Sequence, residues 1–201
     1  MKLTLTTFLT LDGVMQAPGA PDEDRTGGFA HGGWLMPYAD DDMGALVVDW
    51  FAKADAFLLG RRTYDIFAAH WPYVGGEDPI AAALNTLPKH VVSSAPGAPA
   101  WHNAERVTLD DVASLKARPG RELQVHGSGQ LARTLMARGL IDEYRLLVFP
   151  VVLGTGRRFF EEPDQLAALR LTGTKTARSG MVAHTYEPDG APRYGSAALT
   201  G

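Results

Sequence analysis

Residues 123–139 read LQVHGSGQLARTLMARG, and this stretch decides the fold class. Residues 123–126 are a short run typical of a buried strand, and residues 130–138 repeat apolar side chains at helical spacing. A glycine-serine-glycine turn joins the two, and Gly139 stands where a helix commonly ends. The stretch therefore predicts a strand, a glycine-rich turn and a helix in direct succession.

The same order occurs earlier in the chain. Residues 56–59 are a short apolar run that stops at Gly60, and residues 61–67 resume a helical pattern. Residues 90–94 are another short strand, which ends in two serines. Strands that alternate with helices are typical of a mainly parallel sheet covered on both faces. We therefore expect an α/β fold with a mainly parallel central sheet flanked by helices.

The remaining segments complete one domain, expected at residues 1–187. Strands are predicted at 3–8 and 143–152, helices at 43–51, 80–87 and 112–117, and a closing antiparallel C-terminal hairpin at 169–172 and 182–186. Pro150 is expected to confine the end of its strand to a sheet edge or a bulge. Residues 16–38 have no periodicity, which is typical of a functional lid or a disordered loop. Residues 188–201 are expected to form a flexible tail.

Composition excludes several classes of function. The 201 residues carry a formal charge of −4, which gives no electrostatic reason to expect nucleic acid or an anionic membrane as a partner. No run is long and apolar enough for a membrane span, and the N-terminus does not resemble a signal peptide. The chain has no cysteine, which excludes disulfides and suits a cytoplasmic location. The six histidines lack metal-pair spacing, so we expect no metal site.

Three polar turns follow three of the predicted strands. Ligands of parallel sheets gather at the carboxyl ends of the strands, where glycines let a phosphate approach the backbone and helix N-termini attract anions. Each turn alone is compatible with an ordinary connection. Together they suggest a bound dinucleotide, with an extra phosphate recognised by arginine and serine. The turns are Gly60-Arg61-Arg62-Thr63, Ser93-Ser94 and Gly127-Ser128-Gly129.

Four stretches of the chain carry a likeness to a known family. They are residues 10–13 (TLDG), residues 58–64 (LLGRRTY), residues 89–94 (KHVVSS) and the block at residues 125–160. With them the chain resembles the dihydrofolate-reductase superfamily over residues 3–186. It is most similar to the branch that contains the C-terminal reductase domain of the bifunctional riboflavin-biosynthesis enzyme. The resemblance implies a dihydrofolate-reductase-like fold and NADPH as cofactor.

The resemblance also assigns roles to individual residues. Those implied to contact NADPH are Gly13, Gly60, Arg61, Arg62, Thr63, Ser93, Ser94, Gly127, Ser128, Gly129, Gln130 and Leu131. Asp12 lies where the first loop of the family meets nicotinamide and substrate, which makes it the first candidate for a proton donor. Its alternative role is to form the Asp-Gly turn. Asp49 is the second candidate, and a solvated helix residue is the alternative.

Substrate recognition departs from that of true dihydrofolate reductases. Those enzymes carry an acid one helical turn before a tryptophan-phenylalanine pair, which is present here as Trp50 and Phe51. Val47 occupies the position of the acid, so recognition of a pterin through a carboxylate is not expected. Trp34, Trp50 and Phe51 are candidates for contact with the substrate, and core packing is the alternative for each.

Three functions remain open from the sequence. The first is an NADPH-dependent reductase acting on a small heterocycle, riboflavin-precursor-like or pterin-like. The second is dihydrofolate reductase proper, and the third is a nucleotide-binding module without catalytic activity. The resemblance also implies a homodimer.

Overall fold

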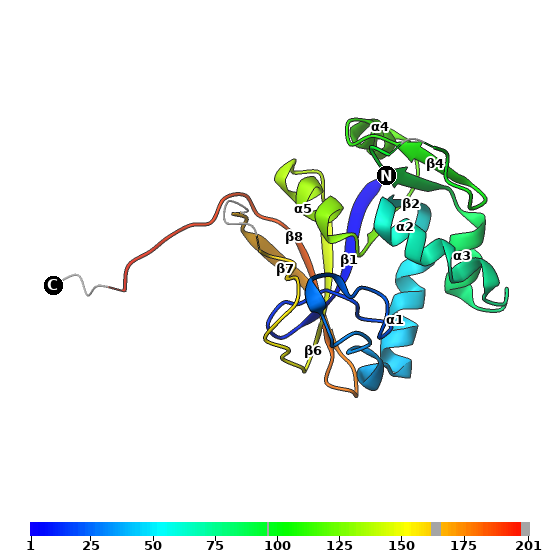
Figure 1. Ribbon diagram of the computed structural model, residues 1–201. Coiled ribbons are helices and arrows are strands. Elements are labelled where there is room, and N and C mark those ends of the chain that lie inside the picture. Colours follow the sequence, from blue (N-terminus) through cyan, green and yellow to red (C-terminus); the bar gives the residue numbers. More distant parts are fainter. Residues whose placement is uncertain (96, 162–165, 198–201) are drawn as a thin grey trace.

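The computed structural model describes residues 1–95, 97–161 and 166–197 (Figure 1). Three short 3-10 turns lie at Thr26–Gly28, Met36–Tyr38 and Trp71–Tyr73. The helices are α1 (Asp41–Phe51), α2 (Arg61–Ala68), α3 (Pro79–Thr86), α4 (Asp111–Ala117) and α5 (Gly129–Ala137). The strands are β1 (Lys2–Thr10), β2 (Ala54–Gly60), β3 (Lys89–Val92), β4 (Ala104–Val107), β5 (Glu122–His126), β6 (Glu143–Phe149), β7 (Leu169–Thr176) and β8 (Val182–Pro188).

The eight strands form one sheet in the order β4-β3-β2-β5-β1-β6-β8-β7. The first six strands in this order, β4-β3-β2-β5-β1-β6, pair in parallel, while β8 is antiparallel to both β6 and β7. The predicted parallel sheet and its antiparallel C-terminal hairpin are therefore confirmed. Because β2, β3 and β5 are neighbours and run the same way, the three turns that follow them lie at one edge of the sheet.

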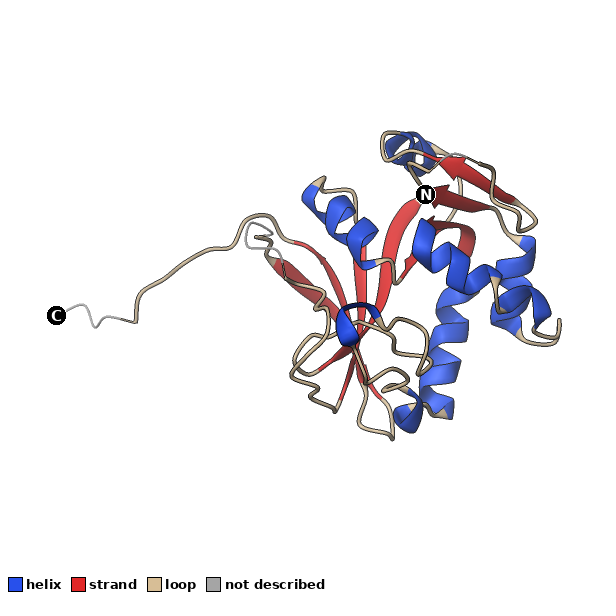
Figure 2. Ribbon diagram, in the orientation of Figure 1, coloured by secondary structure: helices blue, strands red, loops and turns tan. Residues whose placement is uncertain are grey.

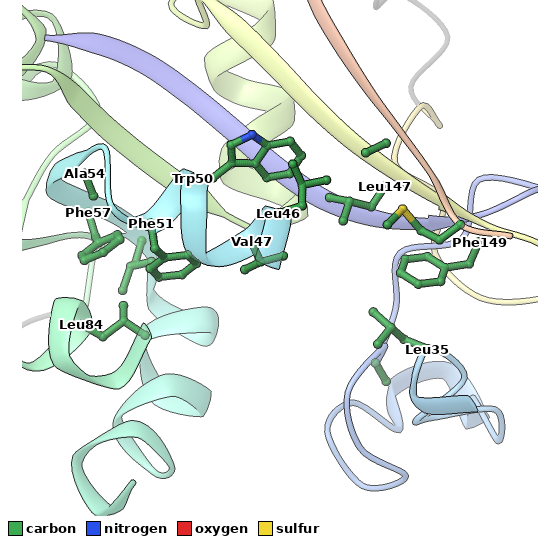
Figure 3. Close-up of a cluster of buried hydrophobic side chains, with 14 of the residues drawn as sticks. Leu35, Leu46, Val47, Trp50, Phe51, Ala54, Phe57, Leu84, Leu147 and Phe149 are labelled. Atoms are coloured by element: carbon green, nitrogen blue, oxygen red, sulfur yellow. The ribbon is translucent and has the colours of Figure 1, made fainter. Parts of the chain in front are cut away.

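Helices cover both faces of the sheet. Buried side chains of α1, α2 and α3 belong to one hydrophobic cluster, and those of α4 and α5 belong to another. Figure 1 shows α1 and α5 on opposite sides of the sheet. In α1 the apolar residues recur at helical spacing, so Leu46, Val47, Trp50 and Phe51 all turn toward the sheet (Figure 3). Asp40 caps this helix by accepting a hydrogen bond from the Met43 N–H at 2.9 Å.

A chain of buried polar side chains crosses the sheet beneath α1. Arg145 donates two hydrogen bonds to Glu122, at 2.7 and 3.0 Å, and one to Glu143 at 2.6 Å. Gln124 donates to Glu122 at 2.6 Å, and its Oε1 lies 3.0 Å from Nε2 of His126. Burial, and secondarily the positive charge of Arg145, lower the pKa of His126 to about 3. His126 is therefore neutral at physiological pH, and the paired charges fix the interior of the sheet.

Strands β4 and β6 differ from the predictions. Strand β4 was not predicted, because two of the four residues in its sequence AERV are charged and it lies at the sheet edge, where no apolar alternation is needed. Strand β6 ends at Phe149 rather than at residue 152, because Pro150 has no N–H to continue the ladder. Of the two places expected for Pro150, a sheet edge or a bulge, the edge is wrong, since β6 lies between β1 and β8.

The predicted tail begins inside β8, which ends at Pro188. Described residues after it run away from the sheet without helix or strand (Figure 2). Residues 198–201 lie outside the described part of the chain, so flexibility of the tail stays a prediction. Within the described residues, we find no helix long and apolar enough to cross a membrane.

Candidate functional site

The structure brings the three predicted turns together. Gly60 at the end of β2 pairs with Val92 at the end of β3, so the turn that starts at Ser93 lies directly beside Gly60. On the other side, the N–H of Gly60 donates a hydrogen bond of 2.9 Å to Oγ of Ser128, which follows β5. The turns after β3, β2 and β5 thus form one continuous polar edge. We call it the glycine edge; it consists of residues 60–63, 93–94 and 127–131.

Two helices begin at the glycine edge with their first N–H groups open. Within the described residues, neither α2 nor α5 has a side-chain hydrogen bond at its N-terminus, whereas α1 and α3 are capped by Asp40 and Asp78. Ser128 stands at the capping position of α5, but its hydroxyl accepts from Gly60 instead. Open N–H groups and the helix dipoles make such a place suited to a phosphate.

The backbone of the turn after β5 is unusual. Ser128 has φ +58° and ψ +55°, the left-handed region that side chains other than glycine seldom adopt. Gly127 precedes it with φ +60°, and a Cβ built there meets no atom within 4 Å. The space above Gly127 is therefore open to a ligand. At Gly129, in contrast, a Cβ would lie 2.7 Å from Sδ of Met15, so the first loop covers this glycine closely.

The remaining predicted cofactor residues differ in exposure. Nε of the exposed Arg61 donates to both carboxylate oxygens of Asp65, at 2.9 and 3.0 Å. Oγ of Ser93 accepts from the Ala95 N–H at 3.1 Å. Thr63 is half-buried, Ser94 and Gln130 are exposed, and Leu131 is a core residue of α5.

Asp12 braces the end of β1 against the segment after β6. Its carboxylate accepts hydrogen bonds from the Thr10 hydroxyl at 2.6 Å and from the N–H groups of Leu153 and Gly154 at 3.2 and 2.9 Å. The Thr10 hydroxyl, and then those backbone donors, lower the pKa of Asp12 to about 2. An ionised carboxylate has no proton to give at neutral pH. These contacts favour the turn-forming alternative, and a role as proton donor stays a prediction.

Asp49 lies in different surroundings. It is exposed on α1 and lines a hollow of about 210 Å³ with Trp50, Lys53 and residues of β7 and β8. In the sheet, β1 and β6 lie between this hollow and the strands of the glycine edge. The hollow beside Asp49 is therefore separate from the glycine edge.

The three aromatic candidates are buried in the core. Trp34 donates from Nε1 to the carbonyl of Gln16 at 2.8 Å, and its ring packs against Phe149. Arg145 lies over the ring of Trp50, and Phe51 stacks on His126 with ring centroids 4.3 Å apart. These contacts favour the core alternative for all three, and for Trp34 specifically a role in pinning the first loop.

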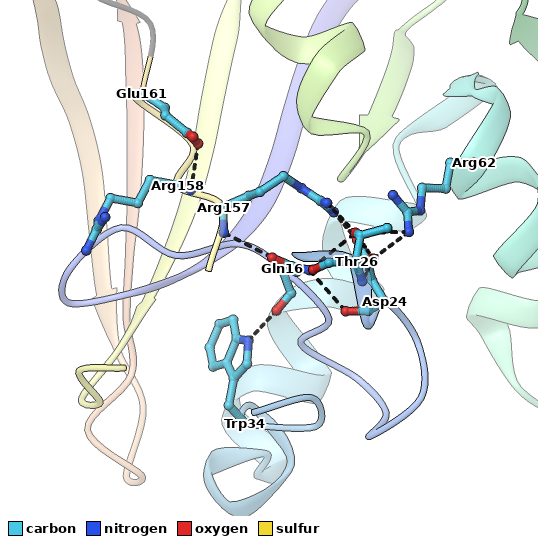
Figure 4. A network of polar contacts seen from close by, with 8 residues as sticks. All are labelled: Gln16, Asp24, Thr26, Trp34, Arg62, Arg157, Arg158 and Glu161. Carbon is cyan, nitrogen blue, oxygen red and sulfur yellow. Dashed lines mark hydrogen bonds and ion pairs between the residues drawn. The ribbon is translucent and has the colours of Figure 1, made fainter. Parts of the chain in front are cut away.

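One cluster of charged residues was missed. Oδ1 of Asp24 accepts a hydrogen bond from Arg62, and Oδ2 accepts one from Arg157 (Figure 4). Thr26 adds an N–H donor to Asp24 at 3.1 Å, and its hydroxyl accepts from Arg157 at 2.6 Å. Gln16 donates to the backbone carbonyls of Asp24 and Thr26 at 3.1 and 3.0 Å. We call Asp24, Thr26, Arg62 and Arg157 the arginine clasp. The sequence offers no signal for it, because Arg157 lies 133 residues from Asp24.

Comparison with known proteins gives the family. The RibD C-terminal domain family matches residues 1–183. The protein YyaP of Bacillus subtilis (strain 168), itself uncharacterized, is 31% identical over 197 residues, which cover 94% of this chain and 96% of YyaP.

Two solved structures share the fold. A protein of Shewanella sp. PV-4, whose description connects it with riboflavin biosynthesis, superposes with a TM-score of 0.70 at 22% identity, over 94% of this chain and 99% of that one. Dihydrofolate reductase from Enterococcus faecalis, in complex with NADP(H), superposes with a TM-score of 0.57 at 12% identity, over 94% and 96%. The predicted dihydrofolate-reductase-like fold is confirmed. The chain belongs to the RibD C-terminal domain family, and this membership supports a reductase-type, oxidoreductase function.

Proposed function

We propose that the chain is an NADPH-dependent reductase that transfers a hydride to a small heterocyclic substrate. The observation that carries the proposal is the joining of two open helix N-termini by the hydrogen bond between Gly60 and Ser128. An anion placed there meets the backbone N–H groups and the dipoles of both helices. A dinucleotide needs such a place for its diphosphate.

The residues of the glycine edge fit the cofactor. Gly127 leaves open space at the turn, and Arg61 is exposed on the first turn of α2, where its guanidinium suits the extra phosphate of NADPH. Ser93 and Ser94 offer hydroxyl groups beside Gly60. When bound, NADPH supplies the hydride, and the protein contributes binding, orientation and exclusion of water.

The protein residues near β1 have a supporting role in this proposal. Asp12 holds the first loop to the segment after β6 and stays ionised, while Gly13 provides the turn with φ +80°. Trp34 keeps the loop folded against the core. Asp49 is exposed at the hollow beside β7 and β8, and we propose that it is a solvated helix residue.

A screen for consumption of NADPH tests the reaction. Small cyclic imines, cyclic ketones and dihydrofolate are offered with NADPH, and loss of the reduced-nicotinamide absorbance is followed. Turnover of a heterocycle other than dihydrofolate is expected. Efficient turnover of dihydrofolate would instead revive dihydrofolate reductase proper, against which the buried Val47 argues. Tight binding of NADPH without any turnover would favour the nucleotide-binding module.

The family resemblance also leads us to propose a homodimer. Gel filtration of the purified protein tests this point, and elution at the size of a monomer would contradict it.

A further inference from the structure

The arginine clasp holds a buried carboxylate between two cations from distant parts of the chain. The side chain of Asp24 is 7% exposed, while those of Arg62 and Arg157 are 54% and 41% exposed. Figure 4 shows the two arginines reaching Asp24 from opposite sides. A carboxylate gripped this way resembles a bound phosphate, because both present charged oxygens to guanidinium forks.

Arg62 stands at the edge of the proposed cofactor site. It is the second residue of α2, whose open N-terminus begins at Gly60. An anion attracted by the dipole of α2 is therefore within the reach of this side chain. In the structure, however, the guanidinium of Arg62 is engaged by Asp24 and lies 3.4 Å from the hydroxyl of Thr26.

The segment that carries Asp24 also covers the other turn. Met15 lies so close to Gly129 that a Cβ there would be 2.7 Å from its sulfur. Residues 15–26 thus contact the glycine edge twice, at Gly129 of α5 and at Arg62 of α2. The two contacts hold the ends of this segment beside the starts of α5 and α2.

We propose that the Asp24 carboxylate masks Arg62 in the free protein, and that a phosphate of the dinucleotide takes the place of this carboxylate. This inference rests on the proposed function. Release of Arg62 leaves Asp24 paired with Arg157 and Thr26, so the exchange does not strand a buried charge. Arg157 thereby acts as the permanent partner of Asp24 and Arg62 as the exchangeable one.

The masking lowers the apparent affinity for the dinucleotide, because only the unmasked fraction of the protein is competent to bind. Asp24→Asn removes the competing charge. We expect it to tighten binding of NADPH by roughly three- to tenfold, as for a masked state that is populated several times more than the open one. Asp22→Asn is the matched control, since Asp22 belongs to the same segment, pairs with Arg25 and is exposed. It changes the net charge equally and is expected to leave the affinity unchanged.

Combining Arg157→Gln with Asp24→Asn separates masking from direct binding. Arg157→Gln removes one cation from Asp24, so the ion pair between Asp24 and Arg62 becomes stronger. NADPH binding by this variant is expected to weaken by roughly twofold or more. The double variant Asp24→Asn/Arg157→Gln is expected to bind NADPH with the affinity of Asp24→Asn alone. If the double variant bound as weakly as Arg157→Gln, Arg157 would contact the cofactor itself and the proposal would be overturned. If Asp24→Asn binds both NADH and NADPH more tightly than wild type, Arg62 binds the diphosphate. If it binds only NADPH more tightly, Arg62 binds the extra phosphate.

Unchanged or weaker binding by a folded Asp24→Asn protein would overturn the proposal. Folding is checked by chemical denaturation. If neither wild type nor Asp24→Asn binds a dinucleotide, the proposed function fails separately. The mask is then tested with inorganic pyrophosphate, by its effect on amide hydrogen exchange of residues 16–28. Faster exchange with pyrophosphate in wild type, and no further increase in Asp24→Asn, supports the mask; no effect in wild type contradicts it.

Discussion

The N–H of Gly60 donates a hydrogen bond of 2.9 Å to the hydroxyl of Ser128, across 68 residues of sequence. This contact ties the end of β2 to the turn after β5 and takes the Ser128 hydroxyl away from its own helix. The N-terminus of α5 is thereby left without a side-chain cap, and among the described residues α2, whose capping residue is Gly60, has none either. The contact therefore links the fold to the site, because the same serine that joins the strands opens the helix for a ligand.

Ser128→Ala is expected to destabilise the protein more than Ser128→Gly. Both variants leave the Gly60 N–H without its acceptor, but alanine keeps the unfavourable left-handed backbone at φ +58°, whereas glycine relieves it. We expect the two variants to differ by about 1 kcal/mol in the free energy of unfolding, measured with urea. Equal free energies of unfolding for the two variants would contradict a strained backbone at Ser128.

Gly127→Ala is expected to weaken NADPH binding at least tenfold. Its methyl group meets no protein atom within 4 Å, so it enters the space proposed for the diphosphate. Gly139→Ala is the matched control, because Gly139 has a similar φ of +62° and equally open surroundings at the far end of α5. Both variants are expected to lose about 1 kcal/mol of stability from the left-handed backbone. Titrations that show equal affinities for the two would remove Gly127 from the cofactor site.

Arg61→Ala is expected to weaken binding of NADPH far more than binding of NADH. A charged hydrogen bond to the extra phosphate is worth about 1.5–3 kcal/mol, which corresponds to at least a tenfold change in Kd. Asp65→Asn serves as control, because it frees Arg61 from its ion pair on α2 without removing the guanidinium. Equal losses for both dinucleotides would refute the assignment of Arg61.

The stabilising effect of Asp12 is expected to vanish in acid. Hydrogen bonds lower its pKa from 3.8 to about 2 in the folded protein, so the unfolded chain binds a proton more readily. The contribution is complete above about pH 4 and is lost as the pH falls from about 4 to about 2. Unfolding free energies of wild type and Asp12→Asn should therefore converge over this window. A difference that does not vary with pH would exclude an ionised Asp12 brace.

The sheet and the glycine edge were predictable because both have local signals. Apolar runs that end in glycine or serine mark the carboxyl ends of buried strands, and parallel neighbours bring those ends together. Gly60 and Ser128 were predicted for one edge on this ground. Strand β4 lacked such a signal because two of its four residues, Glu105 and Arg106, are charged and exposed at the sheet edge.

The arginine clasp was not predictable in the same way. Asp24 and Thr26 lie in a segment without periodicity, and their partners Arg62 and Arg157 come from two other parts of the chain. The structure pairs Arg157 with Asp24 and Thr26. Contacts of this kind depend on how loops pack against the folded sheet and helices. Sequence periodicity does not predict that packing.

The most direct test of the account is a titration of the wild-type protein with NADPH and, separately, with NADH, followed by quenching of its four tryptophans. The account predicts saturable binding of NADPH with a clear preference over NADH. Absence of binding by either dinucleotide would contradict it, because the glycine edge would then be a set of ordinary turns.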